Sequence, residues 1–111
     1  MIRSEFVIRD NKVLSFSLKG HSGLAEAGSD VLCASVSAMA LLVINTLSDA
    51  MGARLDLHIE EKEPRISCTV LSVPSEGERG AEGILHGFYL QMKDLSETYP
   101  EHLTVRTKTK E

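Results

Sequence analysis

The chain contains no tryptophan and only two cysteines, Cys33 and Cys68. Two cysteines are too few for a disulfide scaffold and are compatible with a reducing compartment. Residues 1–5 show no basic segment followed by an apolar run, so we expect no signal peptide and a cytoplasmic location. The longest apolar run, from Val31 to Ile44, is shorter than the roughly 20 residues that span a bilayer. We therefore expect a core helix there and no membrane contact.

The sequence also lacks internal repeats, low-complexity segments and a strong excess of one charge. With 111 residues, of which 42% are hydrophobic and 25% charged, it is long enough to bury the core of one globular domain spanning residues 1–111. The formal net charge of -4 and the absence of tryptophan argue against a dedicated nucleic-acid surface. We therefore expect no direct contact with nucleic acid.

Alternation of apolar and polar residues predicts five strands. The first two are joined by a turn at Asp10-Asn11 and the next two by a turn at Glu63-Pro64, which makes two hairpins. The predicted strands are residues 2–8, residues 13–18, residues 55–60, residues 66–70 and a short segment through Leu103 and Val105.

Two helices separate these strands. The first is expected from Val31 to Met51, because Asp30 or Ser29 can cap its first-turn amides and Gly52 suits its end. The second stops before Pro100 and has one apolar stripe. The stripe consists of Ile84, Phe88, Met92, Leu95 and Tyr99. The resulting order, ββαββαβ, predicts an α+β fold of two layers, in which a mostly antiparallel five-stranded sheet packs against two helices.

Cys33 falls in the expected first turn of the first helix. Exposed amides and the helix dipole at such a position stabilise a thiolate over a thiol, and the thiolate is the nucleophilic form. A cysteine in a core helix can equally be a small buried hydrophobe, and the neighbouring Asp30 adds a negative charge that opposes thiolate formation. Position alone leaves both interpretations open.

His21 stands just after the second strand and is the candidate partner of this thiol. Thiol enzymes that transfer acyl groups need a base that takes the thiol proton and later protonates the leaving amine. The intervening loop can fold back and bring His21 to Cys33, although a loop imidazole that bonds to a carbonyl is the alternative. The amides of Cys33 and Ala34 are the candidates for holding an oxyanion.

The remaining candidate side chains carry weaker signals. Cys68 lies on the apolar face of its strand, which indicates a structural role. His58 shares a strand face with Asp56 and Glu60, a pattern more typical of a solvent-facing strand than of a metal site, so we expect no metal and no cofactor. Ser37 lies one turn beyond the candidate thiol and can donate a hydrogen bond to it, or bond back to a helix carbonyl.

Several of these residues together resemble a known signature. Gly20-His21, a glycine-bearing loop, Asp30-Val31-Leu32-Cys33-Ala34 and Val36-Ser37 are similar to the motif of the ribosomal-processing cysteine protease family (Prp). The resemblance implies a Cys-His protease, in which Cys33 is the nucleophile, His21 is the general base, and Asp30, Ser37 and Ala34 are supporting positions. It also implies a homodimer. The implied substrate is the bacterial large-subunit ribosomal protein twenty-seven, from which a short N-terminal extension is removed.

We therefore predict a cytoplasmic cysteine endopeptidase. One rival hypothesis is a non-catalytic ribosome-assembly or ribosomal-protein-binding factor of the same fold. A second is a thiol redox protein, which is disfavoured because no other cysteine lies near Cys33 in the sequence. We also expect the loop from Ser22 to Ser29, with Gly23 and Gly28 near its ends, to be mobile without substrate and to close over a bound peptide.

Overall fold

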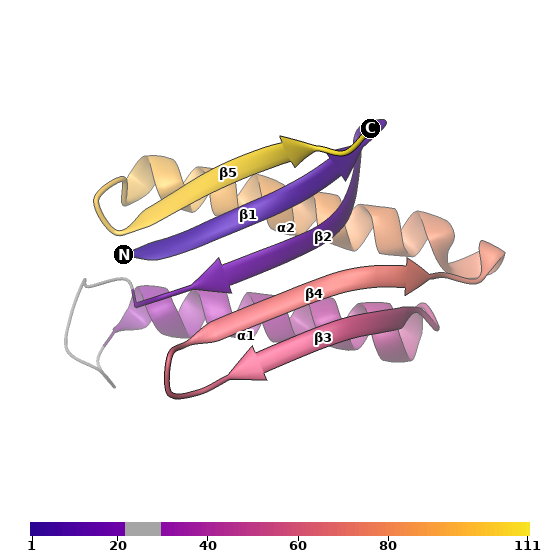
Figure 1. Cartoon of the computed structure of the whole chain (residues 1–111), viewed down its shortest axis with the longest axis horizontal. Helices are drawn as coiled ribbons and strands as arrows, with labels where there is room; N and C mark the ends of the chain where they lie inside the picture. Colours follow the sequence, from indigo (N-terminus) through magenta and orange to yellow (C-terminus); the bar gives the residue numbers. More distant parts are fainter. Residues whose placement is uncertain (22–29) are drawn as a thin grey trace.

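The computed structural model describes residues 1–21 and 30–111, so the predicted loop with Gly23 and Gly28 lies outside the described residues. The strands are β1 (Ile2–Arg9), β2 (Lys12–Lys19), β3 (Arg54–Glu60), β4 (Arg65–Ser72) and β5 (Leu103–Thr109), and the helices are α1 (Val31–Asn45) and α2 (Glu78–Thr98). Both helices lie on the same face of the sheet (Figure 1). The predicted α+β fold and its order ββαββαβ are confirmed.

The sheet is mixed, with the strand order β3-β4-β2-β1-β5. Neighbouring strands are antiparallel except for β1 and β5, which are parallel. After β4 the chain crosses the sheet through α2 instead of a hairpin, and a helical crossover allows a parallel return. The backbone N–H of Ile2 donates to the carbonyl of His102 at 2.9 Å, which secures the start of β1 beside β5.

The turn between β1 and β2 has the conformation that a two-residue hairpin requires. Asp10 and Asn11 have φ values of 50° and 63°. Asn and Asp tolerate this left-handed region, and turns of this kind match the twist of the strands that they join. The turn sets the pairing of Arg9 with Lys12 and of Ile8 with Val13, and an irregularity between Val7 and Ile8 then shifts the register by one residue, so that Phe6 lies opposite Phe16.

The first helix ends differently from the prediction. After α1 the chain makes one π-helical turn, η1 (Thr46–Ala50), in which the N–H of Met51 donates to the carbonyl of Thr46 at 2.9 Å. Gly52 follows with a φ of 69°, so the predicted left-handed glycine at the helix end is confirmed. The helical segment therefore has nearly the predicted length, but its last turn is wider.

The core lies between the sheet and the two helices. Phe88 of α2 packs edge-on against Phe6 and Phe16, with ring centroids 5.6 and 5.0 Å apart. In the predicted stripe of α2, Phe88 and Met92 are buried, whereas the other members are only partly buried. Ala81 and Leu85 are buried in addition, because the helix is rotated slightly from the predicted face.

By length and composition alone, the helical segment Val31–Ala50 is long and apolar enough to cross a membrane. In this fold it packs against the sheet instead. Its buried side chains, Leu32, Val36, Ala40, Val43, Ile44 and Leu47, belong to the core cluster. One side of this helix thus contributes to the hydrophobic core, whereas Val31, Leu41 and Leu42 are exposed.

Candidate active site

Cys33 is held in the first turn of α1 by the cap of that helix. Asp30 has an extended backbone, with φ and ψ of -82° and 96°, and its Oδ1 accepts a hydrogen bond from the N–H of Cys33 at 3.0 Å. The predicted N-cap is therefore confirmed. Cys33 is half-buried. The cap thus fixes the backbone from which the thiol projects.

His21 directly follows a constrained glycine. Gly20 has a φ of 90°, and a Cβ on this residue would lie 2.5 Å from the carbonyl oxygen of Met1. Only glycine fits such a backbone without strain. The N–H of Gly20 also donates to the carbonyl of Pro64 at 3.0 Å, which ties the end of β2 to the β3–β4 turn. Local backbone geometry therefore fixes the direction in which the chain reaches His21.

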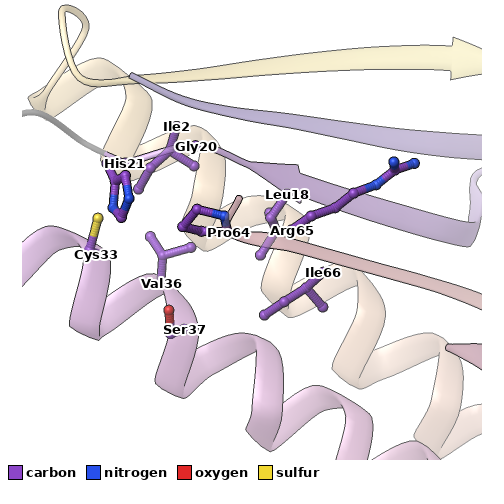
Figure 2. Close-up of a pocket in the computed structure, with 10 residues that line it drawn as sticks. All are labelled: Ile2, Leu18, Gly20, His21, Cys33, Val36, Ser37, Pro64, Arg65 and Ile66. Atoms are coloured by element: carbon purple, nitrogen blue, oxygen red, sulfur yellow. The ribbon is translucent and has the colours of Figure 1, made fainter. Parts of the chain in front are cut away.

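His21 and Cys33 line one cavity of about 220 Å³. The close-up in Figure 2 shows the imidazole ring of His21 and Sγ of Cys33 pointing toward one another. They come from different elements, the end of β2 and the start of α1. The two side chains that the sequence singled out therefore meet at one site, where an imidazole can take the proton of a thiol.

The rest of this cavity is mainly apolar. Its other lining residues are Ile2, Leu18, Gly20, Val36, Ser37, Pro64, Arg65 and Ile66. A mostly apolar cavity with a few polar groups is typical of ligand-binding sites. The space next to the thiol is thus suited to one apolar side chain of a peptide.

A second cavity, of about 400 Å³, adjoins the first and shares Gly20, His21, Pro64 and Arg65 with it. Charged side chains of β2, β3 and the β3–β4 turn form its walls. They are Lys19, Glu60, Lys62 and Glu63. His21 thus lies between the apolar cavity that contains the Cys33 thiol and a charged cavity that does not.

The predicted oxyanion amides already have acceptors. The N–H of Cys33 donates to the Asp30 side chain, and the N–H of Ala34 donates to the Asp30 carbonyl at 3.1 Å. The second bond is the first hydrogen bond of the helix itself. Either amide must therefore exchange an existing acceptor before it can hold an oxyanion.

Cys68 is far less suited to chemistry. It is 1% exposed, and burial, together with the negative charge of Asp56, raises the pKa of its thiol to about 11. At neutral pH this side chain is a neutral thiol in the core cluster. Its predicted structural role agrees with this environment.

Of the other candidate residues, Ser37 lies at the cavity and His58 lies away from it. Ser37 lines the cavity one turn beyond Cys33. His58 contacts Asp56 on the exposed face of β3, with 3.2 Å between Nε2 and Oδ1. Within residues 1–21 and 30–111, no three His, Cys, Asp or Glu side chains gather as metal ligands would.

The walls of the cavity include residues that the sequence analysis did not single out. Ile2 and Pro64 are far from His21 in the sequence and reach the site through the strand order β4-β2-β1. In the sequence, Pro64 is recognisable only as a turn residue and Ile2 only as an apolar position of a strand. Pairing between distant strands brings them together, and a local pattern does not encode that pairing.

A two-layer fold with a thiol and an imidazole facing one cavity has the parts of a thiol-dependent hydrolase. The model of the family described as cysteine protease Prp matches residues 1–104, and the chain belongs to this family of ribosomal-processing enzymes. The resemblance seen in the sequence is confirmed.

Individual relatives agree with this assignment. The Bacillus subtilis (strain 168) protein described as ribosomal processing cysteine protease Prp is 27% identical over 99 residues, which cover 88% of each chain. The fold is shared with the essential ribosomal processing protease Prp from S. aureus in complex with a covalently linked product peptide. The TM-score is 0.86 at 22% identity, over 97% of this chain and 100% of that one. SMU.848 from Streptococcus mutans has a TM-score of 0.83 at 27% identity, over 99% and 96% of the two chains.

Proposed function

We propose that Cys33 and His21 are the nucleophile and general base of a cysteine endopeptidase that removes a short N-terminal extension from the large-subunit ribosomal protein twenty-seven. The observation that carries this proposal is the presence of both side chains in the wall of one apolar cavity. Membership of the Prp family supports the reaction, and the description of the relatives as ribosomal processing proteases supports the substrate class.

In the proposed reaction, His21 takes the proton of the Cys33 thiol. The thiolate attacks the scissile carbonyl, so that the S–C bond forms, and the imidazolium then protonates the leaving amine as the C–N bond breaks. Water, deprotonated by His21, hydrolyses the thioester and restores the thiol. The apolar cavity holds the side chain next to the scissile bond, which positions the carbonyl beside Sγ.

Ser37 and Asp30 are proposed to support this centre in different ways. Ser37 lines the cavity on the same side of α1 as the thiol and can donate to the substrate or to Sγ. Asp30 acts on the backbone, because its carboxylate fixes the first turn of the helix. We also propose that the protein works in the cytoplasm as a homodimer, as the family resemblance implies.

Mass spectrometry of the host's own ribosomal protein twenty-seven tests the proposal. Incubation of its precursor with the enzyme should release the N-terminal extension and leave one new N-terminus. A peptide electrophile should also form an adduct at Cys33 in a manner that depends on His21. If the electrophile labels Cys33 while the precursor stays intact, the protease assignment stands and the substrate is wrong. If neither happens, the protein is a binding factor and the proposal fails.

A further inference from the structure

Three cations lie side by side on the face of the sheet that the helices leave open. Both helices pack on one side, and no segment of residues 1–21 or 30–111 covers the other side (Figure 1). The strand register pairs Arg3 of β1 with Lys19 of β2, and Lys19 with Arg65 of β4. Neighbouring strands are about 4.8 Å apart, so the backbone positions of the three cations lie within about 10 Å.

These side chains point away from the apolar cavity under the sheet. Their apolar neighbours along each strand line the cavity on the α1 side, so alternation puts the three cations on the open face. Figure 2 shows the guanidinium group of Arg65 directed away from Cys33 and His21. All three cationic side chains are exposed. The cations are therefore accessible to a ligand that approaches the open face.

The row of cations is not balanced by ion pairs. Within the part of the chain that the structure describes, none of the three takes part in an ion pair. Only Glu60, at the end of the row on β3, lies opposite Arg65. Like charges directly opposite each other destabilise a sheet, and such conflicts with stability are expected at functional positions. The row is therefore suited to bind an anion from outside the chain.

Other acidic residues of the open face have partners of their own. Glu5 contacts Lys108, with 3.6 Å between Oε1 and Nζ, and Asp56 contacts His58. On the far side of the sheet, α2 is richer in acidic than in basic residues. The net charge of -4, from which we expected no contact with nucleic acid, therefore does not describe this face. This separation of charge orients an approaching polyanion toward the row.

Hydroxyl groups continue the polar surface beside the row. The register places five of them on the same face as the cations: Ser15, Ser17, Ser67, Thr69 and Thr104. Arg, Lys, Ser and Thr supply most phosphate contacts in nucleic-acid complexes. The aromatic residues of the strands, Phe6 and Phe16, are buried on the other side, so bases find no stacking partner there. The surface thus suits a phosphate backbone and not a particular base sequence.

We propose that Arg3, Lys19 and Arg65 bind the phosphate backbone of RNA on the open face of the sheet. Lys19 and Arg65 also line the charged cavity beside His21, so the bound RNA lies next to the candidate site. RNA is the polyanion on which a ribosomal protein lies. The enzyme can thereby process its substrate while that substrate is bound to RNA. This last step rests on the proposed function, whereas the binding of RNA does not.

Fluorescence anisotropy with a labelled single-stranded RNA of mixed sequence tests the binding on the intact protein. Wild type should bind with a Kd on the order of 10⁻⁴ to 10⁻⁶ M near physiological salt. The logarithm of the association constant should fall by about 2 for each tenfold rise in salt, because each neutralised phosphate contributes about 0.7. Arg3→Gln and Lys19→Gln should each remove about 0.7 from this slope and weaken binding about fivefold near 0.1 M salt. Lys19→Arg should retain wild-type binding.

Arg79→Gln is the matched control, because it removes the same charge from α2 on the other side of the sheet. It should leave binding unchanged. Wild type that does not bind the RNA overturns the proposal. An equal loss in Arg79→Gln also overturns it, since net charge alone then explains the binding. Equal displacement of the RNA by polyglutamate overturns the assignment to phosphate, because any polyanion then suffices.

Cleavage assays test the link to the candidate site. Arg3→Gln should cleave a free peptide at the wild-type rate, because Arg3 lines neither cavity, but should cleave the ribosomal protein more slowly when that protein is bound to RNA. Equal rates of wild type and Arg3→Gln on the RNA-bound protein overturn the link. If wild type binds RNA but cleaves neither substrate, the proposed protease fails and the RNA-binding face stands.

Discussion

The backbone N–H of Cys33 donates to the carboxylate of Asp30, with 3.0 Å between nitrogen and Oδ1. The residue that caps the helix and the residue proposed as nucleophile are thus joined directly. The bond fixes where α1 begins, and so where the thiol projects from it. It also occupies an amide that would otherwise be available to a substrate oxygen. Stability and reactivity at this site are therefore linked through one carboxylate.

Replacement of Asp30 should show how much its capping bond contributes to stability. Asp30→Ala removes the acceptor and should lower the free energy of unfolding by about 1 kcal/mol, whereas Asp30→Asn keeps a capping oxygen and should lower it much less. Urea unfolding measures the difference. An Asp30→Ala variant as stable as wild type would show that the capping bond contributes nothing.

The proposed dyad predicts a specific pattern of activity. Cys33→Ala should reduce peptide cleavage by on the order of 10³-fold or more, and His21→Ala should be similarly defective. The double variant should be no worse than either single one, because the two groups act in one step. Cys68→Ala should leave cleavage largely intact. Wild-type rates in Cys33→Ala, or full loss in Cys68→Ala, would exclude the assigned roles.

The high pKa of Cys68 predicts a dependence of stability on alkaline pH. The pKa of the Cys68 thiol is about 11 in the folded protein, whereas its ordinary value is 9.0. Between pH 9 and pH 11, the thiol of the unfolded chain therefore loses a proton that the folded protein retains. The free energy of unfolding therefore falls as pH rises from 9 toward 11, by at most about 3 kcal/mol. The difference between wild type and Cys68→Ala should show this slope in urea titrations. Parallel pH curves for the two proteins would contradict it.

Gly20 should not tolerate a side chain. Gly20→Ala forces a left-handed residue and brings Cβ against the carbonyl of Met1, so we expect a loss of about 1 to 3 kcal/mol in the free energy of unfolding. Slower labelling of Cys33 should accompany this loss, because His21 is displaced.

Gly83→Ala is the control for this substitution. Gly83 lies inside α2, and a Cβ there meets nothing within 4 Å. The change should stabilise the protein by about 0.5 to 1 kcal/mol, because alanine favours a helix over glycine. A loss of stability in Gly83→Ala, or none in Gly20→Ala, would mean that backbone geometry does not explain these positions.

The sequence by itself determined the elements and the chemistry of the two central residues. Alternation in the strands, the turn at Asp10-Asn11, the cap at Asp30 and the glycine at residue 52 are local signals, and local geometry satisfies them without help from distant residues. The motif around Cys33 was likewise short enough to be recognised in the sequence. These features depend on neighbours along the chain, so the sequence pattern was sufficient to predict them.

Only the tertiary structure decided which residues share the cavity. Ile2 and Pro64 enter the site because β1, β2 and β4 are neighbours in the sheet, and the parallel pairing of β5 with β1 follows from the crossover through α2. Only the structure also showed that the amides of Cys33 and Ala34 already donate hydrogen bonds to Asp30. Which strands pair, and which acceptor each amide finds, depends on how buried surfaces fit together across the whole chain. No local pattern of residues specifies that fit.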